Sequence, residues 1–167
     1  MIAPSTYLDT IGEYYPNVEA KAPSGSTDYN DIQWMNGIVI PKSELDQRRR
    51  ELDQQRVWRA IQAERDRRRL AGIRVGDNWF HSDDTSRIQH IGLTIMGANM
   101  PTGIMWKTMA GNFVQMTPQL SMQIFQTLGQ VDMQIFAIAE QHRAAMMQAE
   151  NPTTYNFLTG WPRVFGE

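Results

Sequence analysis

The chain has 167 residues, of which 41% are hydrophobic and 20% charged, a composition typical of a folded protein rather than a disordered one. It contains no cysteine, which excludes disulfide frameworks, thiolate metal sites and cysteine nucleophiles. The first residues lack the basic and apolar segments of a signal peptide, and no run reaches the ~18 apolar residues of a membrane span. We therefore expect a protein that is made and folded in a cytoplasm and does not enter a membrane.

The net charge of −2 is unevenly distributed. Residues 42–70 hold ten basic and six acidic side chains, so this segment carries +4 and the remainder carries −6. A basic segment in an otherwise acidic chain suits contact with nucleic acid or with an acidic protein surface.

Residues 1–41 are expected to form a small β region. The segments 30–34 and 38–40 flank Met35-Asn36-Gly37, and Asn-Gly between β-prone runs predicts a hairpin. Because a lone hairpin is marginal in water, it should pack on the extended segment around Tyr7 or on a partner chain.

A helix is predicted over residues 43–70, with Ser43 as N-cap and Gly72 just past the end. Its apolar positions are sparse, which favours a strut lying against its own domain or another subunit. Arginine clusters at 48–50 and 67–69 are interleaved with carboxylates at helical ion-pair spacing. We therefore favour an ion-paired, solvated helix over a nucleic-acid-binding one.

A second hairpin is predicted where residues 73–75 and 79–81 flank Gly76-Asp77-Asn78. The polar run 82–85 then has the side chains that cap a helix start, and Gly97 ends that helix. One apolar face runs along it, by which the helix should pack with the hairpins; it consists of Ile88, Ile91, Gly92, Ile95 and Met96.

A third hairpin is predicted from residues 104–108 and 113–116, and a long helix from 118 to about 149. The long helix can cover the hairpins and still offer surface to another subunit. After it, an aromatic-rich tail should fold back onto the core. The apolar seam of this helix consists of Leu120, Ile124, Leu128, Val131, Ile135, Ile138 and His142.

No catalytic constellation is evident. His81 beside Asp83 and Asp84 could be read as a metal site, but helix capping accounts for the carboxylates and no second histidine lies at i+4. The sequence has no nucleophile elbow and no glycine-rich phosphate loop. We predict no enzymatic activity, no catalytic residue, no bound metal and no cofactor.

Several rare motifs occur in order along residues 72–162. They are WFHSDDTSR from Trp79, WKTMAGNFV from Trp106, and the closing GWP at Gly160. In this order they resemble an uncharacterised domain family, a domain of unknown function, that recurs in tailed-phage tail-fibre and tail-fibre-assembly proteins. Ala110 departs from the pattern, in which an acidic residue is common at that position. The resemblance implies a virion or virion-assembly role without catalysis.

The predicted fold class is α+β: two short β-hairpins packed with a middle helix and a long C-terminal helix, preceded by a long basic helix and a small β N-terminal region. The expected division is a 1–41 attachment region, a 42–71 connecting helix and a 72–167 tail-fibre-type module. Aromatic and arginine side chains dominate many interfaces. The candidate partner contacts are therefore Trp34, Arg49, Trp58, Trp79, Phe80, Trp106 and Trp161.

These observations lead to the prediction of a bacteriophage tail structural protein, tail-fibre or baseplate-associated, that acts by protein–protein attachment in the virion tail. The expected partners are other tail or fibre proteins, and the resemblance implies a homotrimer. One alternative is a tail-fibre assembly chaperone that is absent from the finished particle. Two others are nucleic-acid binding by the arginine-rich helix, which we do not expect, and carbohydrate binding by exposed aromatic rings.

Overall fold

The computed structural model describes residues 2–167, and their architecture confirms the predicted α+β class. Within this range, three antiparallel strand pairs accompany the helices, and each pair forms its own two-stranded sheet. None of the described helices combines the length and apolarity that crossing a membrane requires.

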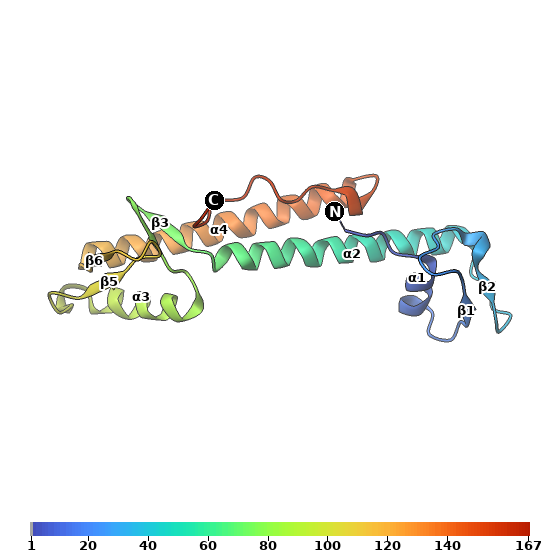
Figure 1. Ribbon diagram of the computed structural model, residues 1–167, viewed down its shortest axis with the longest axis horizontal. Coiled ribbons are helices and arrows are strands. Elements are labelled where there is room, and N and C mark those ends of the chain that lie inside the picture. Colours follow the sequence, from blue (N-terminus) through green and yellow to red (C-terminus); the bar gives the residue numbers. More distant parts are fainter. Residues whose placement is uncertain (1) are drawn as a thin grey trace. The chain divides into compact units, whose positions relative to one another are not determined.

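The α-helices are α1 (Tyr7–Tyr14), α2 (Lys42–Arg69), α3 (Asp84–Met96) and α4 (Pro118–Gln148) (Figure 1). The strands are β1 (Ala20–Lys21), β2 (Gln33–Trp34), β3 (Ile73–Val75), β4 (Asn78–Phe80), β5 (Met105–Lys107) and β6 (Phe113–Gln115), and three short 3-10 turns lie at Tyr29–Asp31, Gly97–Asn99 and Pro152–Thr154.

The chain folds into two compact units. Unit 1 runs to Ile61 and also includes Arg143–Phe157, whereas unit 2 comprises Gln62–His142 and Leu158–Glu167. Both long helices contribute residues to both units. The units therefore cut across the three expected segments 1–41, 42–71 and 72–167, and that division stays a prediction.

Unit 1 has its core around α1, a helix that the sequence reading took for an extended segment. Thr6 and Asp9 form a capping box, in which each side chain accepts a hydrogen bond from the other residue's backbone amide. The hydroxyl of buried Tyr7 donates to the carboxylate of Asp46 on α2. This contact holds α1 against α2. The buried apolar side chains of this core are Tyr7, Ile11, Ile32 and Leu45.

The predicted hairpin around Asn36-Gly37 is wrong. Strand β2 pairs with β1, so that Trp34 lies opposite Ala20, and the amide of Met35 donates to the carbonyl of Glu19 at 2.8 Å. The Asn-Gly signal does not lead to a hairpin because residues 33–35 pair with residues 19–21, and not with residues 38–40 after the turn.

Helix α2 confirms the predicted basic helix, but Ser43 is not its N-cap. The helix begins at Lys42, and the amides of Glu44 and Leu45 both donate to the carbonyl of Pro41 at 3.1 Å. At the other end, Gly72 has φ +97°, a conformation that favours glycine, as expected for a residue just past a helix end.

Unit 2 contains the two predicted hairpins, β3–β4 and β5–β6, with Arg74 opposite Trp79 and Trp106 opposite Val114. The hairpins are joined by a hydrogen bond from the amide of Met109 to the carbonyl of Trp79 at 2.9 Å. They pack on the first half of α4, whose seam is confirmed at Ile124, Leu128 and Ile135. The buried apolar core between these hairpins and α4 consists of Ile73, Phe80, Met100, Met116, Ile124 and Leu128.

The C-terminal tail of unit 2 folds back as predicted. Trp161 and Val164 are buried, and the amide of Phe165 donates to the carbonyl of Ala71 at 3.2 Å. The edge of the Phe165 ring meets Trp79 with the ring centroids 6.1 Å apart. The tail therefore covers part of the β3–β4 hairpin.

Candidate partner-binding surfaces

The polar residues before α3 have structural roles. Asp83 is the N-cap of the helix and accepts hydrogen bonds from the Ser86 amide at 3.0 Å and the Ser86 hydroxyl at 2.7 Å. The hydrogen bond from the Ser86 hydroxyl, together with the one from the Ser86 amide, holds the pKa of the Asp83 carboxyl below its usual value. Asp84 forms an ion pair with Arg69. Within residues 2–167, no three histidine or acidic side chains gather where they could hold a metal ion.

Arg87 fixes the orientation of α3 against α4. Its guanidinium forms a two-armed ion pair with the carboxylate of Asp132, with N–O distances of 2.6 and 2.9 Å. It also donates to the carbonyls of Ser82 at 2.5 Å and Arg69 at 2.9 Å. One side chain thus ties α3, α4 and the end of α2 together within unit 2, because a planar guanidinium can serve several acceptors at once.

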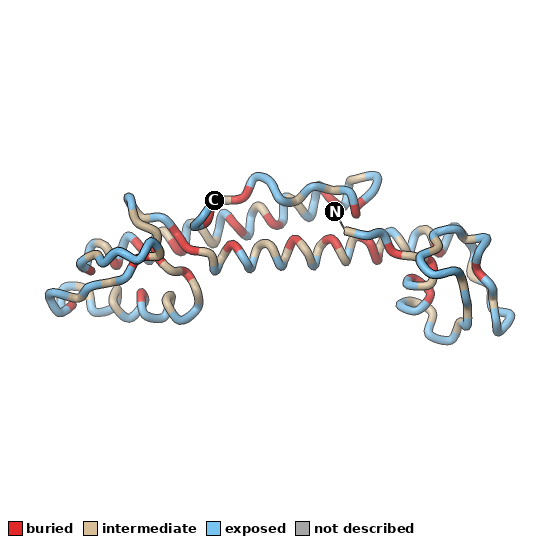
Figure 2. Tube along the Cα trace, in the orientation of Figure 1, coloured by how far each residue is buried: buried red, intermediate tan, exposed pale blue. Residues whose placement is uncertain are grey.

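The apolar face of α3 does not enter the core, contrary to the expectation from its periodicity. Ile88 is 71% exposed and Ile95 is 80% exposed, and Ile91 and Met96 also lie open to solvent. Figure 2 shows most of α3 in the pale blue of exposed residues. The inward face carries the polar side chains of Arg87, His90 and Thr94, and beside them Leu93 packs against the core of unit 2.

A groove of about 610 Å³ lies between this exposed side of α3 and the neighbouring side of α4. Ile91 lines it on the α3 side, and Phe125 and Met133 line it on the α4 side. The Arg87–Asp132 ion pair also borders the groove. We define the α3–α4 face as the exposed apolar side chains on both sides of this groove: Ile88, Ile91, Ile95, Met122, Phe125 and Met133.

The α3–α4 face lies in a nearly uncharged part of the chain. Residues 88–131 contain a single Asp, Glu, Lys or Arg, which is Lys107. The charged side chains that border the groove, Arg87 and Asp132, neutralise each other. The predicted partner contacts were all aromatic or arginine residues, so they do not include this face. The near absence of charge along residues 88–131 is the sequence feature that indicates it.

His90 lies beneath this face and is fully buried. Its ring stacks on Trp106 with the centroids 4.5 Å apart and meets the edge of Phe80 at 6.3 Å. Among the described residues, none makes a hydrogen bond of normal geometry to either ring nitrogen. Burial lowers the pKa of His90 to about 4, although the backbone of His81 lies near enough to favour the charged form slightly.

A second apolar surface lies in unit 1, on the loop that sequence reasoning placed in a hairpin. Met35, Ile38 and Val39 are all exposed there. The loop is anchored at one end by the hydrogen bond from the Tyr29 hydroxyl to the carbonyl of Ile40, at 2.8 Å. This apolar loop is a separate candidate contact.

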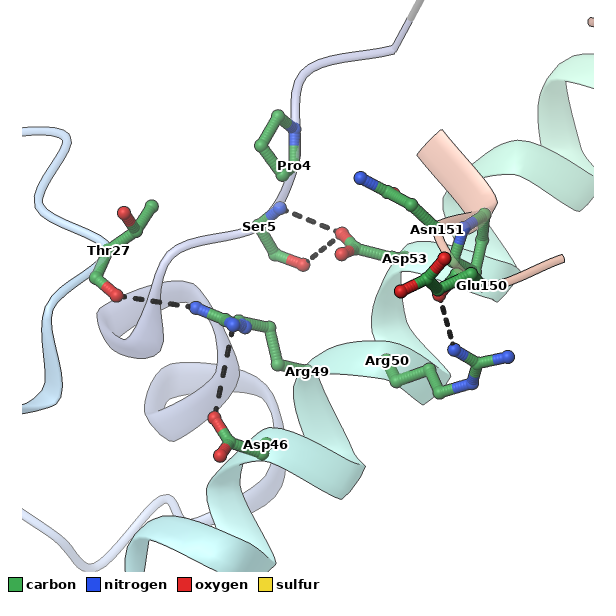
Figure 3. A pocket seen from close by; sticks show the side chains of 10 residues that line it. Pro4, Ser5, Thr27, Asp46, Arg49, Arg50, Asp53, Glu150 and Asn151 are labelled. Carbon is green, nitrogen blue, oxygen red and sulfur yellow. Dashed lines mark hydrogen bonds and ion pairs between the residues drawn. The ribbon is translucent and has the colours of Figure 1, made fainter. Parts of the chain in front are cut away.

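Unit 1 also contains a polar pocket of about 550 Å³ (Figure 3). In it, the carboxylate of buried Asp53 accepts hydrogen bonds from the hydroxyl and the amide of Ser5, the latter at 2.7 Å. Arg50 donates to the carbonyls of Ala149 and Glu150, at 2.7 and 2.6 Å, and so holds the residues that directly follow α4. These polar groups hold the N-terminal arm and the end of α4 to α2, which is a structural role.

Two of the predicted partner contacts belong to the interior, which corrects that prediction. Phe80 is fully buried in the core of unit 2, and Trp161 is buried beside His142, with the ring centroids 5.2 Å apart. Their aromatic character reflects core packing.

The other five predicted contacts are half-buried. Trp34 packs against the core of unit 1, and Trp58 lies under the guanidinium of Arg143 at 4.9 Å. Arg49 lies over the ring of Tyr7 at 4.4 Å. In unit 2, Trp79 contacts Phe165 and Trp106 stacks on His90. Among the large apolar side chains, those with the most open surface are instead isoleucine, methionine and phenylalanine residues.

The ion pairing predicted for the arginine clusters is confirmed. Arg48 pairs with Glu51 at 2.8 Å, and Arg67 and Arg68 both pair with Glu64, at 2.8 and 2.6 Å. The hydrogen bond from Arg67 holds the pKa of the Glu64 carboxyl below its usual value, against the opposing effect of burial.

Comparisons with known proteins give one match, which is to a protein family. Neither the curated proteins nor the solved structures contain a match to this chain. Residues 53–159 match a protein family described as "Domain of unknown function (DUF4376)". The match begins within α2, includes α3 and both hairpins of unit 2, and extends past the end of α4. Because the match spans more than half of the sequence, the chain belongs to this family.

Proposed function

We propose that this protein is a non-enzymatic attachment component of a bacteriophage tail, fibre- or baseplate-associated, that holds other tail proteins by direct contact. The observation that carries the attachment role is the uncovered α3–α4 face of unit 2. The phage setting rests on the motifs at Trp79, Trp106 and Gly160.

The polar groups of the protein support attachment over catalysis. Asp83 caps α3, Asp53 anchors the N-terminal arm, and Arg50 holds the residues that directly follow α4. Each group is committed to holding one segment against another. The apolar side chains, by contrast, stand uncovered at two places, the α3–α4 face and the loop of Met35 and Val39. Large exposed apolar patches commonly mark protein-binding sites.

The proposal is tested on particles produced by the genome that carries the gene. Purified particles are analysed by quantitative mass spectrometry, beside particles from a strain in which the gene is deleted and supplied in trans. We expect the protein at a fixed number of copies per particle, and defective tails or fibres without it.

Two other results would change the assignment. Absence from finished particles, together with defective fibres in the deletion strain, would replace the structural role by the assembly-chaperone role. Absence from particles with normal tails and fibres in the deletion strain would reject the phage-tail function altogether. A matched variant, Ile95→Lys on the exposed surface of α3, should reproduce the deletion defect while the protein still accumulates.

A further inference from the structure

We propose that the α3–α4 face is a self-association surface, and that its occupant is the same face of a second copy of this chain. The inference rests on the proposed attachment function, which requires a partner, and adds that one partner is the protein itself. It depends on the area of the face, its lack of charge and its groove.

The exposed apolar area is close to what a stable dimer needs. Its most open side chains are Ile95 at 80%, Ile88 at 71% and Met133 at 68% exposure, and the other three are between 42% and 45% exposed. With roughly 180 Å² for each fully exposed side chain, the six present on the order of 600 Å². A standard interface buries about 800 Å² per partner, so these six side chains alone would supply about three quarters of that area.

The charge distribution favours a second copy over an unrelated partner. Two copies of a charged face would repel each other, whereas this face carries only the internally neutralised pair of Arg87 and Asp132. The six apolar side chains of the face carry no charge, and Lys107 is the one charged residue in the stretch 88–131. Depletion of charge at the centre is typical of homodimer interfaces, which are more apolar than those between transient partners.

The groove provides a place for side chains of the second copy. It is lined by the apolar Phe125, Leu128 and Met133, and by Gly129, which has no side chain to fill it. A ridge formed by Ile88, Ile91 and Ile95 runs along the adjacent α3. A twofold rotation would place the ridge of each copy against the groove of the other, which is the self-complementary arrangement of a closed dimer.

Analytical ultracentrifugation over a dilution series of the full chain tests the proposal. We expect the mass of two chains at high concentration and of one chain on dilution. A mass of three chains, the trimer that the family resemblance implies, would reject the twofold arrangement. The double variant Ile88→Glu/Ile95→Lys places charges at two exposed positions and should weaken the association about a hundredfold or more, since each charge would lose its water in the interface. Circular dichroism should show an unchanged helix content.

The matched control is Leu158→Lys, an equally drastic change at an exposed side chain of the unit 2 tail. It should leave the association constant unchanged. Because the chain has no cysteine, single introduced thiols give a second readout. The thiol of Ile91→Cys should react slowly with a thiol reagent at high concentration and faster on dilution, whereas Leu158→Cys should react at one rate.

Three other results would overturn the proposal. They are a single-chain mass at every concentration, an association that the Ile88→Glu/Ile95→Lys variant leaves intact, and an Ile91→Cys reaction rate independent of concentration. The first of these results, combined with binding of another tail protein or of a lipid vesicle through the same face, would assign the face to that other occupant. Binding of a tail protein would leave the attachment function standing, and its presence in particles is measured separately.

Discussion

Acidification should destabilise unit 2 through His90. Its pKa lies near 4 in the folded protein against an ordinary value of 6.5, because the ring is buried between Trp106 and Phe80. The backbone of His81 and the negative charge of Asp83 act in the opposite direction, and only the charge of the His81 side chain acts in the same direction as burial. Unfolding therefore takes up a proton below pH 6.5, and the folded state loses stability as the pH falls.

The magnitude follows from these two pKa values. Above pH 6.5 the ring is neutral in both states and contributes no pH dependence; below pH 4 it is charged in both, and the full difference of about 3 kcal/mol is lost. Between pH 7 and pH 5 the loss is about 2 kcal/mol. The window from pH 7 to pH 5 suits the measurement because ordinary carboxylates titrate mostly below it.

The assay is urea unfolding at pH 7 and pH 5, with amide hydrogen exchange of α3 to report unit 2 separately. His90→Phe removes the titrating ring and should abolish most of the pH dependence. Thr94→Val lies on the same inward face, where the Thr94 hydroxyl donates to the carbonyl of His90 at 2.8 Å. It should lower stability equally at both pH values. A wild-type loss that His90→Phe retains in full would refute the reasoning.

Three further changes have defined outcomes. Asp53→Ala leaves the hydrogen-bond donors of the N-terminal arm unpaired and should lower the free energy of unfolding by about 1–3 kcal/mol, measured in urea; an unchanged value would mean that the arm is not anchored there. Gly72→Ala should lower the melting temperature, because φ is +97° and the new Cβ would lie 2.3 Å from the Met109 sulfur; an unchanged melting temperature would contradict that geometry. Asp132→Asn removes one charge of the ion pair with Arg87, and it should speed hydrogen exchange in α3 about tenfold or more; the same exchange rate as wild type would show that the pair does not hold the helix.

Sequence reasoning located the elements whose signals are local. The capping run before α3, the seam of α4 and the two unit 2 hairpins were each readable from neighbouring residues, although the run did not single out Asp83 as the N-cap. Helix α1 was missed although Thr6 and Asp9 have capping-box spacing, because it is only eight residues long and the segment around Tyr7 was expected to be extended. The β1–β2 pairing could not be read, since two-residue strands carry no usable pattern.

The candidate surface could be predicted only in part. Periodicity correctly placed Ile88, Ile91 and Ile95 on one face of α3, but periodicity alone does not say whether an apolar face meets its own core or a partner. That choice depends on Arg87 and His90, which turn the opposite face inward through the ion pair with α4 and the stacking on Trp106. Both contacts are between residues far apart in sequence, so no local pattern indicates them.

The double hydrogen bond from Arg50 to the end of α4 has a consequence for synthesis on the ribosome. It joins residues separated by 99 and 100 positions, and unit 1 as a whole includes Arg143–Phe157. Translation at ~5–20 residues per second takes roughly 5–20 seconds to cover that distance. Unit 1 therefore cannot complete its fold until residues 143–157 have emerged, and until then the Arg50 side chain lacks these two acceptors.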